Sequence, residues 1–378
     1  MIDLGEIEIS DEQIELLNVA ESFVRDQSSI ASVRALIDDE AGFDKLVWQQ
    51  MGELGWLSIA IPEEYGGAGL SLGEVVPVAE MLGRGLVASP FRTTTLAAQA
   101  ILSGAKKAQK SEILPQIAAG QAATMALSEA DSGWDLGRIK SKAQSFRSGY
   151  RLSGTKVLVK HLQAANWIVA SVLLDDQPRL VLLNKSDIKH SRREIIIDET
   201  QRCHEISLDG IIINQDQLMD VKNTSDCLQY IHLAANLLIA SNMTGACKSV
   251  IDYTVEYLKT RRQFGKLIGS FQALKHPMVD AFVDYEKARS LLYAAAHSFN
   301  KQRVGEISTR MAKVSACSAL SFAADRAIQF HGGFGFSYEC DAQLYRRKAI
   351  FEISQYGDEV YHKTKLADLF FKNADPVL

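Results

Sequence analysis

Apolar residues along this 378-residue chain change their spacing twice, from helical to β-type and back to helical. Up to about residue 122 they recur at helical spacing, which begins after Ser10, where Ser10 and Gln13 form a capping-box pattern. From 124 to about 214, short β-rich runs alternate with turn residues, and from about 221 helical spacing returns. A β-rich segment between two helical ones predicts three domains, with the bounds 1–122, 123–218 and 219–378.

The runs of the middle segment are short and closely spaced, which is typical of a small barrel or sandwich. They are 155–159, 167–173, 179–183, 194–197, 206–208 and 211–213. The C-terminal segment has no further strand signal, and its long helical patterns are 225–259, 272–299, 306–329 and 356–371. We therefore expect an α+β multidomain fold with an N-terminal helical domain, a middle β-barrel or sandwich domain and a C-terminal helical bundle, because a chain of this length exceeds one ordinary core.

Charge and composition exclude several classes of protein. The net charge is −5 and no long basic block occurs, so nucleic acid is not an expected partner. The five cysteines form no CxxC pair and no cluster with metal-ligand spacing, which predicts reduced thiols and no metal site. The N-terminal residues are acidic rather than signal-like, and the apolar run 233–240 is short and contains Asn236. These features predict a cytoplasmic protein without a membrane span.

The C-terminal third carries residues suited to a large anionic ligand. Arg261 offers a fixed cation with a planar donor fork, and Gly332 and Gly333 let a backbone approach a ligand closely. A pyrophosphate requires this combination of a cation and close backbone donors. Taken singly, the arginine could belong to a surface ion pair and the glycines to a helix cap. Taken together, they predict half of a site for a bulky anionic cofactor.

The order and spacing of these segments resemble the acyl-CoA dehydrogenase family over essentially the whole chain. Two segments of the middle domain extend the likeness, 126–135 and 156–161. The resemblance implies FAD as the cofactor and a CoA thioester as the substrate. It also implies residues that bind the adenosine side of the FAD of a neighbouring subunit. In this chain they are Arg261, Phe264, Phe271, Gln272, Gln329, Gly332 and Gly333.

The same resemblance places four residues around the flavin ring, and two of them depart from the family pattern. Leu127 and Ser128 match the segment that lines the ring, where a hydroxyl usually hydrogen-bonds the flavin. Leu158 replaces an aromatic residue near the ring, and Lys160 replaces a hydroxyl residue that faces its reactive nitrogen. Trp134 replaces a small serine that touches the substrate. The alternative is that small loop shifts move Trp134 and Lys160 aside.

The residue that removes the α-proton of the thioester is a carboxylate in this family. The usual position in the family's Y-E-G-T segment matches Gly357 here, and the alternative position on the first long C-terminal helix matches Ala235, followed by Asn236. None of these residues can accept that proton. Asp358 and Glu359 are the candidate substitutes, and their alternative role is that of acids in the first turn of a helix.

These departures gather at the flavin ring, the base and the thioester, whereas the adenosine side is retained. Glu129 is a weaker candidate base, and His331 is interpreted as a packing residue of the cofactor loop. The pattern resembles the subunit without a catalytic base in heteromeric bacterial acyl-CoA dehydrogenases, and it implies a tetramer and an acceptor such as electron-transfer flavoprotein. Alternatives are a homotetramer that uses Asp358 or Glu359, a flavin-dependent monooxygenase or oxidase, and a structural partner without flavin.

Overall fold

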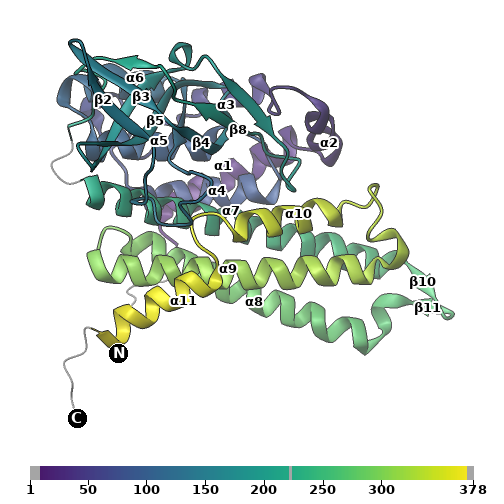
Figure 1. Cartoon of the computed structure of the whole chain (residues 1–378). Helices are drawn as coiled ribbons and strands as arrows, with labels where there is room; N and C mark the ends of the chain where they lie inside the picture. The colour runs from purple at the N-terminus through teal and green to yellow at the C-terminus, as the bar shows by residue number, and fades with distance from the viewer. Residues whose placement is uncertain (1–8, 221–223, 373–378) are drawn as a thin grey trace.

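The computed structural model describes residues 9–220 and 224–372. It contains two helical regions and a β region between them in sequence, as predicted, so the fold class is confirmed. In Figure 1 the strands and the N-terminal helices form the upper part, and the C-terminal helices form a bundle below them. The acidic N-terminal residues 1–8 and the expected return of helix at 221 lie outside the described residues.

The N-terminal region is built from helices whose starts are fixed by side-chain caps. The Ser10 hydroxyl accepts from the backbone N–H of Gln13, and the side-chain oxygen of Gln13 accepts from the backbone N–H of Ser10. These two bonds confirm the capping box. Ser71 and Glu74 form a second one. The helices are α1 (Asp11–Gln27), α2 (Ile30–Asp38), α3 (Lys45–Glu53), α4 (Val76–Arg84), α5 (Phe91–Gly104) and α6 (Lys107–Ala118).

The middle region forms a six-stranded and a three-stranded sheet. In the larger sheet β5 (Ala165–Leu174) is central, antiparallel to β6 (Gln177–Asn184) and parallel to β1 (Ala122–Ala126). The sheet continues through β2 (Lys142–Phe146), β3 (Gly149–Ser153) and β9 (Ile212–Ile213). The smaller sheet is β4 (Thr155–Lys160), β8 (Cys203–Ser207) and β7 (Ser191–Glu194).

Three strands of this region were not predicted, and one prediction was misplaced. The alanines of β1 have a low preference for strands, so burial on both faces rather than local propensity determines that strand. The hairpin of β2 and β3 is polar on its exposed side and gives a weak pattern. The predicted run 194–197 is wrong beyond Glu194, where β7 ends and Ile195 is fully exposed.

The C-terminal region consists of long helices, with one hairpin that contradicts the expectation of no strand. Strands β10 (Arg262–Gln263) and β11 (Lys266–Leu267) pair across a two-residue turn, in which Phe264 and Gly265 both have left-handed backbone angles, φ 52° and 73°. Such turns suit the twist of short hairpins. The helices are α7 (Thr224–Thr260), α8 (Gln272–Ser298), α9 (Gln302–Phe330), α10 (Ala342–Ile353) and α11 (Glu359–Ala367).

Helix α10 was missed by the sequence reading. Its buried face carries Lys348 and Glu352 together with apolar residues, so the apolar spacing that marks an ordinary amphipathic helix is interrupted. The same feature places charged groups inside the protein, which becomes important for the site.

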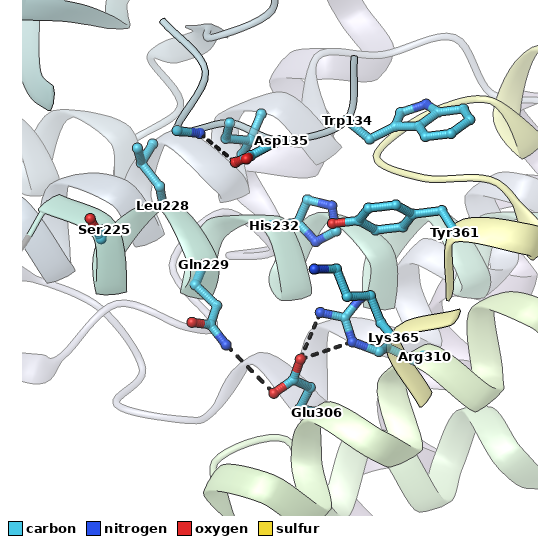
Figure 2. Close-up of a pocket in the computed structure, with 12 residues that line it drawn as sticks. Trp134, Asp135, Ser225, Leu228, Gln229, His232, Glu306, Arg310, Tyr361 and Lys365 are labelled. Carbon is cyan, nitrogen blue, oxygen red and sulfur yellow. Dashed lines mark hydrogen bonds and ion pairs between the residues drawn. The ribbon is translucent and has the colours of Figure 1, made fainter. Parts of the chain in front are cut away.

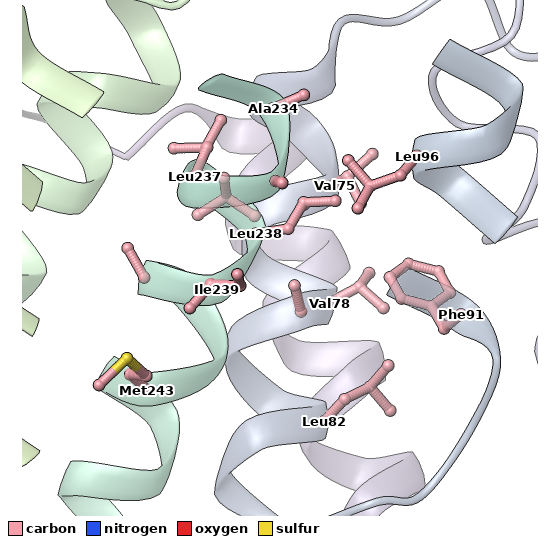
Figure 3. Packing of buried hydrophobic residues seen from close by; sticks show 14 of the residues in the cluster. Val75, Val78, Leu82, Phe91, Leu96, Ala234, Leu237, Leu238, Ile239 and Met243 are labelled. Carbon is pink, nitrogen blue, oxygen red and sulfur yellow. The ribbon is translucent and has the colours of Figure 1, made fainter. Parts of the chain in front are cut away.

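One hydrophobic core runs through both helical regions, and the β region has a smaller core of its own. Figure 3 shows Leu238 of α7 facing Val78 of α4, with Phe91 of α5 beside them. The helices α4 and α7 approach so closely that a Cβ on Gly245 would lie 1.8 Å from the carbonyl oxygen of Glu80. Within the described residues, α7 and the other helices lack the length of apolar sequence that a membrane span requires.

Candidate functional site

The residues expected on the adenosine side lie on the outer surface at one end of the bundle. Arg261 follows directly after α7 and is exposed, and within the described residues its guanidinium has no ion pair. Phe264, at the tip of the β10–β11 hairpin, is 89% exposed, and Phe271 lies beside it, with ring centroids 6.2 Å apart. Gln272 is exposed at the start of α8. Arg261, Phe264 and Gln272 therefore lie on the exposed surface of the chain.

A turn after α9 brings the glycine segment to the same end of the bundle. The ring of His331 stacks on Tyr257 and Tyr253 of α7, at centroid distances of 4.1 and 4.8 Å. This stacking holds Gly332 and Gly333 near the end of α7, and no atom lies within 4 Å of the place where either would carry a Cβ. Gln329 is exposed one turn earlier. The structure therefore brings these residues together as an open surface and gives His331 a packing contact.

The residues expected around the flavin ring are arranged differently. Leu127 is buried, and Ser128 is half-buried, with its carbonyl accepting from the backbone N–H of Val157. Leu158 has φ 55° and donates its backbone N–H to Glu194. Lys160, at the end of β4, is buried rather than exposed in the cleft between the domains.

The ammonium of Lys160 belongs to a buried group of charges that we call the Glu352 cluster, defined as Glu352, Arg92, Lys160 and Lys348. Arg92 of α5 lies 2.7 Å from the Glu352 carboxylate, and Lys348 and Lys160 lie 3.9 and 4.0 Å from it. Burial would raise the pKa of Glu352, but the three cations hold it well below its usual range. Burial lowers the pKa of Lys160 to about 8, against the opposing effect of Glu352.

Glu129 is committed to a structural role inside the β region. Its carboxylate accepts from the Lys156 ammonium at 2.7 Å and from the backbone N–H groups of Lys140 and Ser141. Burial acts to raise the pKa of Glu129, and the Lys156 bond and charge outweigh it and lower that pKa. These three donors use most of the lone-pair sites of the carboxylate and hold it inside the β region.

A cleft of about 440 Å³ opens between the β region and helices α7, α9 and α11. Figure 2 shows Trp134 beside Tyr361 on one side and Lys365 and Arg310 below them. The indole N–H of Trp134 donates to the carbonyl of Ser354 at 2.8 Å, which fixes the ring against the loop that joins α10 to α11. Trp134 therefore forms part of the cleft wall, at the place where the family resemblance expects a small residue.

The expected base positions hold no carboxylate, and the structure fills the space of one of them. Gly357 has φ 108°, and a Cβ there would lie 2.5 Å from Tyr361 and 2.8 Å from Nε2 of His362. Ala235 is fully buried in α7, and the neighbouring Asn236 donates its amide to the carbonyl of Tyr356 at 3.1 Å. A longer side chain at 357 would have to displace two rings.

Both candidate substitutes have local partners. Asp358 is the N-cap of α11 and accepts from the backbone N–H of Tyr361 at 2.8 Å. Glu359 forms an ion pair with Lys363 one turn later and accepts from the hydroxyl of Ser318. Each carboxylate thus does what an acid at a helix start ordinarily does.

Sequence reasoning passed over several polar residues around this loop. Gln355, the residue two before Gly357, is only 8% exposed, and its carbonyl accepts from the buried Lys313. Burial first, and then nearby charges that include Arg310, lower the pKa of His232 to about 3 and that of His362 to about 2, so both imidazoles are neutral. The sequence signal that could have indicated these buried polar residues is the frequency of histidine, lysine and glutamine in helices that are otherwise rich in apolar residues.

Comparison with known proteins agrees with this architecture. Models of the acyl-CoA dehydrogenase N-terminal and C-terminal domains match residues 10–121 and 234–367. Acyl-CoA dehydrogenase IpdE2 of Mycobacterium tuberculosis is 31% identical over 87% of this chain and 87% of that protein. The Tcur3481–Tcur3483 steroid ACAD has a TM-score of 0.86 at 26% identity, over 97% of this chain and 99% of that one. The ChsE4–ChsE5 complex from M. tuberculosis shares the fold, with a TM-score of 0.87 at 22% identity and coverage of 98% and 100%.

A β region between two helical regions, matched by models of both domains, is the architecture of a class of flavoprotein oxidoreductases. The chain belongs to the acyl-CoA dehydrogenase family, whose cofactor is FAD. The residues of the adenosine side fit that cofactor, because a cation and open glycines face outward together. The residues of the ring side do not fit it, because Lys160 is buried in an ion cluster where a hydroxyl residue is expected.

Proposed function

We propose that this chain is the subunit without a catalytic base in a heteromeric acyl-CoA dehydrogenase, which carries out α,β-dehydrogenation of a CoA thioester. The observation that carries the proposal is the loop between α10 and α11. Gly357 has no side chain and no room for one, Asp358 caps a helix, and Glu359 is paired with Lys363. Gln355, the buried polar side chain of the loop, is an amide and cannot accept the α-proton.

The adenosine-side surface supports the second half of the proposal. Arg261, Gln272 and the Gly332–Gly333 turn are exposed and face away from their own chain, so a phosphate-bearing ligand bound there would be shared with a neighbour. Two structural relatives carry two-chain names, the Tcur3481–Tcur3483 steroid ACAD and the ChsE4–ChsE5 complex. By analogy we assign this chain to a tetramer with a homologous partner that holds the flavin ring and the base.

The other parts of the assignment follow from this analogy. The electron acceptor is an electron-transfer flavoprotein or a similar carrier, and the assembly is cytoplasmic, in keeping with five buried free cysteines. Bacterial steroid or side-chain degradation is the corresponding process, because a steroid ACAD is among the relatives.

The decisive experiment compares the chain alone with the chain co-expressed with a homologous subunit that carries a glutamate base. We expect no acyl-CoA dehydrogenation by the purified chain with an artificial electron acceptor, and turnover by the co-expressed assembly. Turnover by the chain alone that is lost in Asp358→Asn or Glu359→Gln would contradict the proposal and establish a displaced carboxylate. An intact far-ultraviolet circular dichroism spectrum is the control for folding.

A further inference from the structure

Lys160 reaches across the boundary between the β region and the C-terminal bundle. It starts from the end of β4, where its carbonyl accepts from the hydroxyl of Thr124 at 2.6 Å. Its ammonium lies 4.6 Å from the ring centroid of Phe351 and 4.0 Å from the carboxylate of Glu352, both on α10. One side chain thus connects two surfaces that belong to different regions of the fold.

These distances leave no room for a planar ring between the two surfaces. A ring inserted between two faces needs a contact distance of about 3.5 Å on each side, and therefore a gap of about 7 Å. The gap from the Lys160 ammonium to α10 is 4.6 Å at the Phe351 ring and 4.0 Å at Glu352. A ring could enter only if Lys160 moved away from both residues.

Such a movement would take one of its three cations away from the buried Glu352 carboxylate. Glu352 is fully buried and Lys348 is 2% exposed, so neither can turn to water. Arg92 contacts the Glu352 carboxylate from a third region, the start of α5. The same helix α10 is anchored from behind by Lys313 of α9, which donates to the carbonyls of Glu352 and Gln355 at 2.8 and 3.2 Å. The cluster therefore ties three parts of the fold together, and opening it separates a lysine from a buried carboxylate.

We propose that the Glu352 cluster takes the place of the flavin ring in this chain, so that the chain closes its own ring site with protein and contributes only the adenosine side to the flavin of its partner. This inference rests on the proposed function and adds the physical reason for it, because exclusion of the ring comes from packing as well as from the missing base. In this chain, the Glu352 cluster accordingly connects the regions of the fold, and no flavin ring is bound between them.

The test is the amount of FAD that the purified chain retains after incubation with excess FAD and gel filtration, measured by visible absorbance. We expect the wild-type chain to retain little FAD and Lys160→Thr to retain about tenfold more, because the shorter side chain widens the gap to α10. Lys140→Thr is the matched control, since Lys140 is an exposed lysine paired with Asp131. It should behave as the wild type does.

Phe351→Ala opens the same gap from the side of α10 and replaces Lys160→Thr if that variant fails to fold, as judged by its melting curve. About one FAD per wild-type chain, or equal retention by the wild type, Lys140→Thr and the gap-opening variant, would overturn the inference. The experiment distinguishes an incorrect inference about the ring from an incorrect proposed function. A chain that retains FAD and still turns over no acyl-CoA overturns only the inference about the ring, whereas turnover by the chain alone overturns the proposed function.

Discussion

The two halves of the cofactor site in this chain differ in how they treat solvent. The region proposed for the adenosine side is an exposed surface that carries Arg261 and the open glycines, and the arginine has no ion pair within the described residues. The region expected to hold the ring instead contains buried charges, with Arg92 and Lys160 both paired to Glu352 within the chain. The difference teaches that the two halves are separable. The exposed half adds little to the stability of the fold, whereas the buried half contributes contacts between its regions.

The largest expected effect comes from removing the carboxylate of the closed half. Glu352→Gln leaves Arg92, Lys160 and Lys348 without their anion in a buried place, so we expect a loss of about 3–5 kcal/mol in the free energy of unfolding. Urea denaturation of the purified chain measures it. Glu256→Gln, which breaks an exposed pair with Lys259, should change stability by less than about 0.5 kcal/mol. Equal losses in the two variants would show that the cluster does not close the ring side.

The second effect is a pH dependence that belongs to Lys160. Its pKa is about 8 in the folded chain and 10.5 in the unfolded reference, so between these values the unfolded chain binds the extra proton and stability rises with pH. The total gain is on the order of 3–4 kcal/mol, since a pKa difference of one corresponds to about 1.4 kcal/mol. The groups that face Lys160 are Glu352 and Lys348 of α10, Arg92 of α5 and Cys203 of β8.

Lys160→Met isolates this contribution, because the other groups remain in both proteins. Chemical denaturation from pH 7.5 to 10 should show the wild type gaining stability on the variant as the pH rises through about 8. A stability difference that stays constant over this range would mean that Lys160 is hydrated, and that the ring side is open.

The third effect concerns the open half. Arg261→Ala should leave the melting temperature of the chain unchanged, because the side chain is exposed and has no ion pair within the described residues. In the assembly with its partner, the same variant should weaken FAD binding by about 1.5–3 kcal/mol, the value of a hydrogen bond to a charged group. Isothermal titration of the apo assembly with FAD measures this. Lys259→Ala, an exposed cation paired with Glu256, is the control. Unchanged affinity for FAD in Arg261→Ala would contradict the proposal that FAD is shared across an interface.

The smallest effect lies at the loop between the two halves. Asp358→Asn keeps a good N-cap and should change stability by only a few tenths of a kcal/mol, whereas Asp358→Ala should lose about 1 kcal/mol. Thermal melts of the three proteins compare them. If Asp358→Asn instead abolished a measurable activity of the chain, the carboxylate would be a base rather than a cap.

The sequence predicted the order of helical and β regions and four of the long helices, because these depend on local spacing and on caps such as that of Ser10. It missed α10 and the Glu352 cluster for one reason. Arg92, Lys160 and Glu352 are far apart along the chain, and no local pattern relates a lysine at the end of a strand to a glutamate on a helix nearly two hundred residues later. Gln355 was missed because the family's Y-E-G-T segment was aligned to begin at Tyr356, one residue later.

The contact between α4 and α7, where Gly245 lies against the carbonyl of Glu80, has a consequence for synthesis of the chain. The ribosome releases α4 about 140 residues before α7 begins. At bacterial-scale rates of about 5–20 residues per second, the apolar face of α4 waits roughly 10–30 s for its partner helix. During that interval the face of α4 that carries Val78 and Leu82 lacks α7, the helix on which it packs in the folded chain. The N-terminal helices therefore reach their final packing only after the whole β region has left the ribosome.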